Sequence, residues 1–270
     1  MGTQAPVIFG SVVTFTPLLM EFSEQVLIIQ LGQFKEADLW VRLLSPTRGL
    51  LSAFAFGGSK SRRRFTGCLD VFNEVNVHIK SGKQGEYLAL QEGVLIKGPL
   101  RLREDWRRFG MASNCIKFLQ SFGVGPDGAS KAHALVLQTL RLLEEADILP
   151  LQLPLFFRVR LAFDQGYALE MTRCGLCSAP LEGRGAWLAL ERGVLYCSVC
   201  RFEIKDESRR FVFLDAGGLD VLASVKNDSP LEWAGLKVSG ANLAVAARAM
   251  DSFVQYHVGL SWENGRFRRV

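Results

Sequence analysis

The chain has 270 residues, of which 49% are hydrophobic and 22% are charged, and its formal net charge is +5. This composition is typical of soluble globular proteins, and the length allows a substantial core and favours two domains over one. No run of about 18 uninterrupted apolar residues occurs, so the sequence predicts no transmembrane helix and no membrane partner.

Residues 1–23 are predicted to be an extension that precedes the first domain. Positions 1–20 carry no charged residue, and prolines and glycines interrupt their apolar run. A signal peptide begins with a basic region, whereas the first Lys or Arg of this chain is Lys35. We therefore interpret the segment as an extension, or as sequence upstream of a start at Met20.

Residues 24–82 are predicted to form a small β-barrel of the OB-fold type. Short apolar stretches separated by Gly- and Pro-containing turns read as strands at 25–34, 38–45, 50–56 and 74–80. In the last of these the alternation is clearest, with Val75, Val77 and Ile79 on one face. Several short strands within about 60 residues are typical of such a barrel.

A glycine-rich connection between apolar, strand-like segments at 50–56 and 69–75 concentrates positive charge. Residues 35–108 hold 14 Lys and Arg against 8 Asp and Glu, so the basic excess lies in one third of the chain. Localised positive charge is the electrostatic footprint of a polyanion-binding surface, most often one for nucleic acid. The alternative is an ordinary basic surface that maintains solubility. The four cations of the connection are Lys60, Arg62, Arg63 and Arg64.

Four phenylalanines lie in or beside this region. Phenylalanine in a strand usually belongs to a core, so we expect Phe54, Phe56 and Phe72 to be buried. Phe65 adjoins the arginine run and is the best candidate for stacking on a nucleic-acid base.

Residues 83–270 are predicted to be a mainly helical domain. Apolar residues recur at helical spacing in four segments, which are 101–122, 131–145, 155–163 and 242–256. Gly123–Gly128 matches the GxGxxG pattern of dinucleotide-binding loops, but it follows a helix and contains Pro126. We interpret it as a connection between helices.

Two CxxC pairs interrupt the helical domain at 173–201. Cys174 and Cys177 are separated by 19 residues from Cys197 and Cys200. Each pair places two thiolates on one tight turn, and two such turns supply the four ligands of tetrahedral Zn²⁺. We expect one structural Zn²⁺ per chain, because four cysteines leave no open position for catalysis. Two disulfides are the alternative, disfavoured because nothing in the sequence indicates an oxidising compartment.

The sequence offers little for catalysis. Its three histidines, His78, His133 and His257, are far apart and lie in no metal-binding motif. No nucleophile, base and orienting group come together. We expect a protein that is not an enzyme and has no small-molecule substrate.

Several stretches together resemble the RecO family of bacterial recombination mediator proteins over residues 24–270. The N-terminal part of the pattern is fairly specific, the cysteine pattern less so by itself. The segments that carry the resemblance are Gly32–Leu44, Thr47–Ala53, Gly57–Ser61, Phe65, Leu155–Gly166, the two cysteine pairs and Ser252–Gly259. The chain departs from the family in its uncharged extension and its denser arginine run.

The resemblance implies an α+β protein with an N-terminal OB-fold, a helical body and an inserted zinc finger. It also implies a non-enzymatic protein of the bacterial cytoplasm and nucleoid that binds single- and double-stranded DNA and anneals complementary strands. With the partner RecR, such proteins help to load RecA onto DNA coated by the single-strand-binding protein SSB. Some members lack the cysteines, so zinc supports the fold and is not a family requirement.

On this interpretation the cations of the connection meet DNA phosphates, because side chains on a loop stay solvated until DNA arrives. Lys35, Arg42 and Arg48 are expected to add supporting contacts. Two alternatives remain. One is a zinc-ribbon RNA-binding or transcription-associated factor, and the other is a zinc-stabilised interaction module that binds no nucleic acid.

Overall fold

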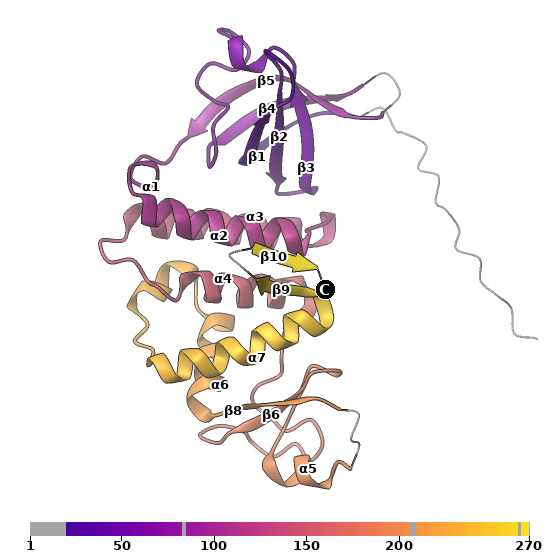
Figure 1. Cartoon of the computed structure of the whole chain (residues 1–270), viewed down its shortest axis with the longest axis vertical. Coiled ribbons are helices and arrows are strands. Elements are labelled where there is room, and N and C mark those ends of the chain that lie inside the picture. Colours follow the sequence, from indigo (N-terminus) through magenta and orange to yellow (C-terminus); the bar gives the residue numbers. More distant parts are fainter. Residues whose placement is uncertain (1–19, 83–84, 206–208, 264–265, 270) are drawn as a thin grey trace, which may run out of the picture.

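The molecule is elongated, with three parts in succession along its long axis (Figure 1). The computed structural model describes residues 20–82, 85–205, 209–263 and 266–269. A β-barrel forms one end, helices form the middle, and a small sheet beside four cysteines forms the other end. This confirms the expected α+β class, with an OB-type barrel followed by a mainly helical domain that carries a four-cysteine insert. Residues 1–19 of the expected extension lie outside the described part.

Five strands close the barrel in the order β1-β2-β3-β5-β4, as in an OB-fold. Neighbouring strands are antiparallel except β3 and β5, which are parallel. In β4 the predicted alternation is confirmed, since Val75, Val77 and Ile79 are buried. The strands are β1 Glu21–Gln33, β2 Leu39–Ser45, β3 Gly49–Ala55, β4 Glu74–Ser81 and β5 Leu88–Lys97.

The barrel extends beyond the predicted limits on both sides. Because β5 belongs to it, the boundary expected at residue 82 falls between two strands of the barrel. Residues 21–23, assigned to the extension, pair with β4 as part of β1. The strand-like stretch 69–73 instead forms turns. Phe72 there has a left-handed backbone (φ 68°), and its N–H donates to the Ile28 carbonyl at 2.7 Å.

The four predicted helical segments are all present. Asp105 divides the first of them, because its extended backbone ends α1 and its carboxylate accepts the Arg107 N–H at 2.8 Å, which caps α2. Residues 123–125 connect α2 to α3, so the GxGxxG stretch is a helix–helix connection as expected. The α-helices of the body are α1 Arg101–Glu104, α2 Trp106–Phe122, α3 Pro126–Glu145, α4 Leu153–Ala162, α6 Ala216–Asn227 and α7 Gly240–Val258.

Shorter elements complete the body. A π-helical turn, η2 (Phe163–Tyr167), extends α4, and η3 (Pro230–Gly235) precedes α7. Strands β9 (Leu260–Glu263) and β10 (Arg266–Arg269) form a hairpin after α7. Within the described ranges, no helix combines the length and the apolar character needed to span a bilayer.

The cysteine-bearing insert is a three-stranded antiparallel sheet in the order β7-β6-β8. Its strands are β6 Ala186–Ala189, β7 Val194–Tyr196 and β8 Phe211–Leu214, and α5 (Ser198–Glu203) follows β7. Because β8 pairs with β6, the folded insert extends beyond the predicted boundary at residue 201 and ends at Leu214.

Two hydrophobic cores hold the chain together. One fills the barrel and includes Val26, Ile28 and Val41. The other is shared by the helices and the insert, and it also takes in apolar side chains from the outer side of the barrel, among them Leu27 and Phe72. The barrel is thus a separately packed unit whose outer apolar side chains join the helical core, and it lies directly against the helices (Figure 1).

Candidate nucleic-acid interface and metal centre

The basic connection between β3 and β4 is fixed firmly on the barrel. At its start, the Gly57 N–H donates to the Asp38 carboxylate at 2.7 Å and the Ser59 N–H donates to the Ala37 carbonyl at 3.1 Å. Further along, Phe65 and Cys68 are buried in the barrel core. We call residues 57–67 the arginine loop. Its backbone is held at both ends, so its cations occupy defined positions on the surface.

The four cations of the arginine loop differ in how free they are. Lys60 Nζ lies 2.7 Å from Glu36 Oε1, and Arg64 Nη2 donates to the Phe56 carbonyl at 2.6 Å. Arg62 and Arg63 are exposed, and their guanidinium groups make no hydrogen bond or ion pair with any other described residue. The two cations best placed to meet an anion are therefore Arg62 and Arg63.

The supporting cations are divided between two places. Lys35 Nζ lies 5.5 Å from the Phe34 ring centre, beside the turn that braces the arginine loop. On the outer side of β2, Arg42 Nη1 donates to Ser52 Oγ at 3.0 Å. Arg48 lies before β3 and the loop follows that strand, so they are about 20 Å apart.

Arg48 has local partners of its own. Its guanidinium stacks on Phe22 at 3.8 Å and lies 3.4 Å from Glu24 Oε2. The structure therefore places Lys35 beside the arginine loop, Arg42 midway along β2, and Arg48 at the side that faces the helices.

Three of the four phenylalanines do not lie where the sequence suggested. Phe65, the expected stacking residue, is only 3% exposed and belongs to the barrel core. Phe72 is buried as expected. Phe54 and Phe56, expected in the core, lie on the outer face, and Phe56 is 38% exposed. The signal was the alternation Ala53-Phe-Ala-Phe56, in which the small residues take the interior positions.

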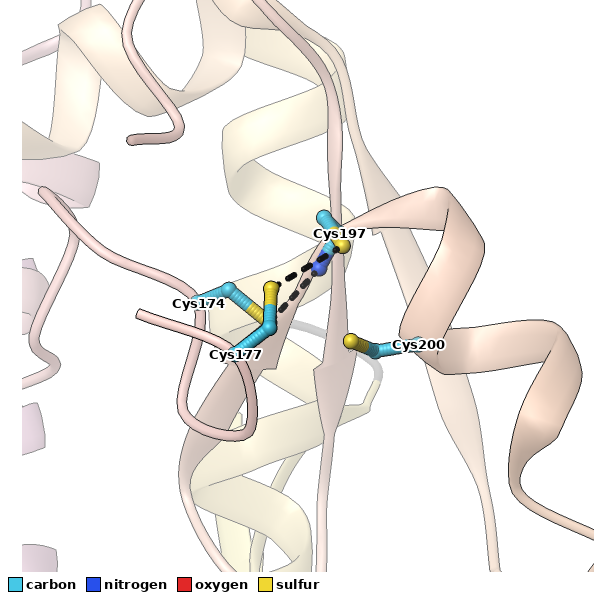
Figure 2. Close-up of side chains that lie close together, drawn as sticks. All are labelled: Cys174, Cys177, Cys197 and Cys200. Atoms are coloured by element: carbon cyan, nitrogen blue, oxygen red, sulfur yellow. Dashed lines mark hydrogen bonds between the residues drawn. The ribbon is translucent and has the colours of Figure 1, made fainter. Parts of the chain in front are cut away.

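Four cysteines meet in the insert (Figure 2), at the end of the molecule away from the barrel (Figure 1). Cys174 and Cys177 come from the loop that precedes the sheet, Cys197 follows β7, and Cys200 lies on α5. All four sulfur atoms lie within 4.8 Å of one another. The sulfur atoms of Cys177 and Cys197 are 3.8 Å apart. Two thiolate ligands of a tetrahedral zinc site have a separation of about 3.8 Å. The four cysteines could therefore hold a metal ion, and no disulfide joins any of them.

The backbone around the cysteines favours thiolate. Burial opposes ionisation of Cys174, but N–H groups of Cys177, Cys197 and Leu176 outweigh it and lower its pKa to about 6. The Cys197 N–H donates to this sulfur at 3.3 Å. Hydrogen bonding with Cys177 raises the pKa of Cys200. The Cys174 thiolate is thus favoured without a metal, whereas Cys200 would need a bound cation to ionise.

The histidines form no second site. His78 lies on the barrel surface beside Glu21, His257 bonds the Leu190 carbonyl, and burial lowers the pKa of His133. Apart from the cysteines, the described residues contain no group of three or more His, Cys, Asp or Glu side chains placed to hold a metal.

Comparison with known proteins agrees with this layout. The family model described as "Recombination protein O N terminal" matches residues 20–99, and "Recombination protein O C terminal" matches residues 103–266. The DNA repair protein RecO of Oleidesulfovibrio alaskensis is 48% identical over 252 residues, which cover 93% of this chain and all of that protein. Its namesake in Maridesulfovibrio salexigens is 40% identical with the same coverage.

A more distant relative shows the same correspondence over most of the chain. The DNA repair protein RecO of Anaeromyxobacter dehalogenans is 26% identical over 89% of this chain and 92% of its own length. Both family models and these relatives agree on one assignment. The chain belongs to the RecO family of DNA repair proteins.

Proposed function

We propose that the protein is a non-enzymatic recombination mediator that binds single- and double-stranded DNA and anneals complementary strands. Together with RecR, it would help to load RecA onto DNA coated by SSB, in the bacterial cytoplasm at the nucleoid. Its place in the RecO family supports the repair role, and the named partners follow from the family resemblance.

One observation carries the assignment of the DNA-binding surface. Arg62 and Arg63 are exposed, lack a partner among the described residues, and lie on a loop whose backbone is anchored to the barrel. Two such charges repel each other until an anion arrives, so phosphate contacts relieve the repulsion and release counterions from DNA. Lys35, Lys60, Arg42 and Arg64 would complete the basic surface, while Arg48 would contribute less because it lies at the opposite end of β3 from the arginine loop.

The metal in this proposal is one Zn²⁺ held by Cys174, Cys177, Cys197 and Cys200. Four thiolates at these separations suit the tetrahedral geometry that zinc adopts in structural sites. Four protein ligands leave no position for water or substrate, so the ion would stabilise the insert and take no part in a reaction.

The test replaces Arg62 and Arg63 together with alanine. Single-strand binding weakens with salt by a slope of about −0.7 per phosphate contact, so losing two contacts should flatten the slope by about 1.4. The same relation predicts a roughly tenfold loss of affinity for an oligonucleotide at about 0.15 M salt. Strand annealing should slow in parallel.

A matched control removes two exposed cations of the helical body, Lys237 and Arg248. The control variant has the same net charge as the test variant, so a general effect of charge would weaken DNA binding by both variants equally. If the arginine-loop variant binds and anneals like the parent over the whole salt range, the loop is only a solvated surface and the assignment is wrong. Binding that prefers RNA over DNA of the same sequence would instead support the RNA-binding alternative.

A further inference from the structure

Four aromatic side chains gather on the outside of the barrel, and we call them the aromatic face: Phe34, Phe54, Phe56 and Tyr87. Phe34 follows β1, Phe54 lies in β3, Phe56 follows it, and Tyr87 precedes β5. The ring centres of Phe34 and Phe54 are 4.8 Å apart, and those of Phe54 and Phe56 are 6.0 Å apart and nearly parallel. Tyr87 stands edge-on to both Phe54 and Phe56.

These rings are not part of either hydrophobic core. Phe34 is 50% exposed, Phe56 38% and Tyr87 39%, and none of them packs into the barrel interior or the helical body. The interior positions of β3 are taken by Ala53 and Ala55, which are fully buried. An antiparallel sheet with one solvated face ordinarily turns polar side chains outward. A cluster of exposed rings in that place marks a binding surface.

The surroundings of the aromatic face indicate what it binds. Lys35 lies over the Phe34 ring, Arg64 donates to the Phe56 carbonyl, and the free Arg62 and Arg63 directly precede Arg64 in the same loop. Arg42 lies on the neighbouring strand, opposite Ser52 on the same outer side. The carboxylate of Glu36 is occupied by Lys60, and the exposed Glu86 adjoins Tyr87. Rings bordered mainly by cations are the chemistry of single-stranded nucleic-acid surfaces, where bases stack and phosphates are neutralised.

We propose that the aromatic face stacks the unpaired bases of single-stranded DNA whose phosphates contact the arginine loop. This rests on the proposed function and adds a second, salt-independent contribution to binding. A duplex gains little from the rings, because its bases are already stacked on one another. The face therefore gives the barrel a preference for single strands that the cations alone do not supply.

The experiment compares two probes of equal length and charge, an oligo-dT and an abasic oligonucleotide with the same number of phosphates. The parent should bind oligo-dT at least tenfold more tightly, since stacking on one aromatic residue is worth about that much. Replacing Phe34 and Phe56 together with alanine should abolish this preference. Affinity for the abasic probe and the salt slope should stay as in the parent.

Three variants sharpen the result. Phe34→Leu with Phe56→Leu keeps apolar surface without a π-face, so it should behave like the alanine variant, whereas replacement of both by Tyr should restore the preference. Trp106→Ala removes a 77%-exposed ring of the helical body, also flanked by an arginine, and should change nothing.

Three outcomes would overturn stacking. In the first, the parent binds both probes equally. In the second, the double leucine variant binds oligo-dT like the parent. In the third, the alanine variant changes only the self-association of the protein in sedimentation, which would make the face a contact between copies. The salt slope of the Arg62→Ala/Arg63→Ala variant is measured separately, so failure of stacking and failure of the proposed DNA-binding role give different results.

Discussion

At the scale of single residues, Gly49 determines how closely the barrel packs against the helices. It ends the turn between β2 and β3 with a left-handed backbone (φ 74°), and a Cβ at this position would lie 2.2 Å from the Val124 carbonyl oxygen. The next residue, Leu50, donates its N–H to that same carbonyl at 3.0 Å. The absence of a side chain at Gly49 is thus what lets the barrel approach the α2–α3 connection.

Gly49→Ala should therefore be strongly destabilising. The left-handed backbone costs about 1–2 kcal/mol for a residue with a Cβ, and the clash with a backbone carbonyl adds to it, so we expect a loss of about 3 kcal/mol in the free energy of unfolding. Urea denaturation measures this. Gly67→Ala is the matched control, because Gly67 has a similar φ of 65° but nothing within 4 Å of its Cβ position. Its loss should be about 1 kcal/mol. Equal losses in the free energy of unfolding at the two sites would show that the contact between barrel and helices accommodates the new side chain without further loss of stability.

At the scale of elements, Glu144 of α3 holds the beginning of α1. Its carboxylate accepts the N–H groups of Leu100, Arg101 and Leu102 at 2.9–3.0 Å, which are donors that a helix start leaves without partners. Burial would raise the pKa of Glu144, but these three N–H groups and the Arg101 charge outweigh it and lower the pKa below 4.5. The carboxylate thereby ties the segment leaving the barrel to the helical body.

Glu144→Gln should reduce the free energy of unfolding by about 1–2 kcal/mol at neutral pH, the range for losing a helix cap. The folded-state pKa lies below the unfolded value near 4.5, so the carboxylate stabilises the fold above that pH. This contribution is lost as the pH falls through the folded-state pKa, and the difference between parent and variant should shrink there. Denaturation at a series of pH values measures both effects.

The neighbouring Glu145 provides the control for this prediction. Its carboxylate pairs with Arg141 at 2.9 Å, and both side chains are more than half exposed. Such surface pairs contribute little, so Glu145→Gln should change stability by less than about 0.5 kcal/mol. A Glu144→Gln variant as stable as Glu145→Gln, at every pH, would contradict the capping role.

The sequence predicted those elements whose signal is local. The alternation of β4 and the helical spacing of α3 are visible within their own residues, and the strands and helices appear there. In β5, by contrast, Gly93 breaks the pattern and the exposed Val94, Leu95 and Ile96 hide the alternation. Its place in the barrel depends on pairing with β3 and β4, which sequence periodicity does not contain.

Of the candidate sites, the sequence likewise predicted the cysteine cluster, whose signal is local, and did not predict the aromatic face. The CxxC spacing predicted the cysteine cluster because each pair lies on one short turn and the ligands need only two such turns to meet. The aromatic face is assembled from three strand ends that are distant in sequence. Phe65 points inward and Phe56 outward, the opposite of what the sequence suggested for both, and only for Phe56 did the local alternation with Ala53 and Ala55 carry a signal.

At the scale of the whole molecule, the two sites lie at opposite ends and rest on different cores. The arginine loop and the aromatic face belong to the barrel, which has its own interior core. The cysteines share a core with the helices, since Cys174, Cys200, Leu188 and Phe253 all belong to it. Loss of a metal should therefore weaken the helical body and leave the interior of the barrel packed.

Cys177→Ser tests this coupling. The variant should lose its bound zinc by metal analysis, and because zinc contributes on the order of 10 kcal/mol in finger peptides, the helical body should melt more than about 10 °C earlier than in the parent. Hydrogen exchange should show faster exchange in β6–β8 and α7, while the amides of the β1–β4 ladder stay protected. Leu176→Ser, a 59%-exposed neighbour that offers no ligand, should keep the metal and the parent's melting temperature. If the barrel amides lose protection together with those of the insert, the two cores unfold as one unit, and if zinc stays bound, Cys177 is not a ligand.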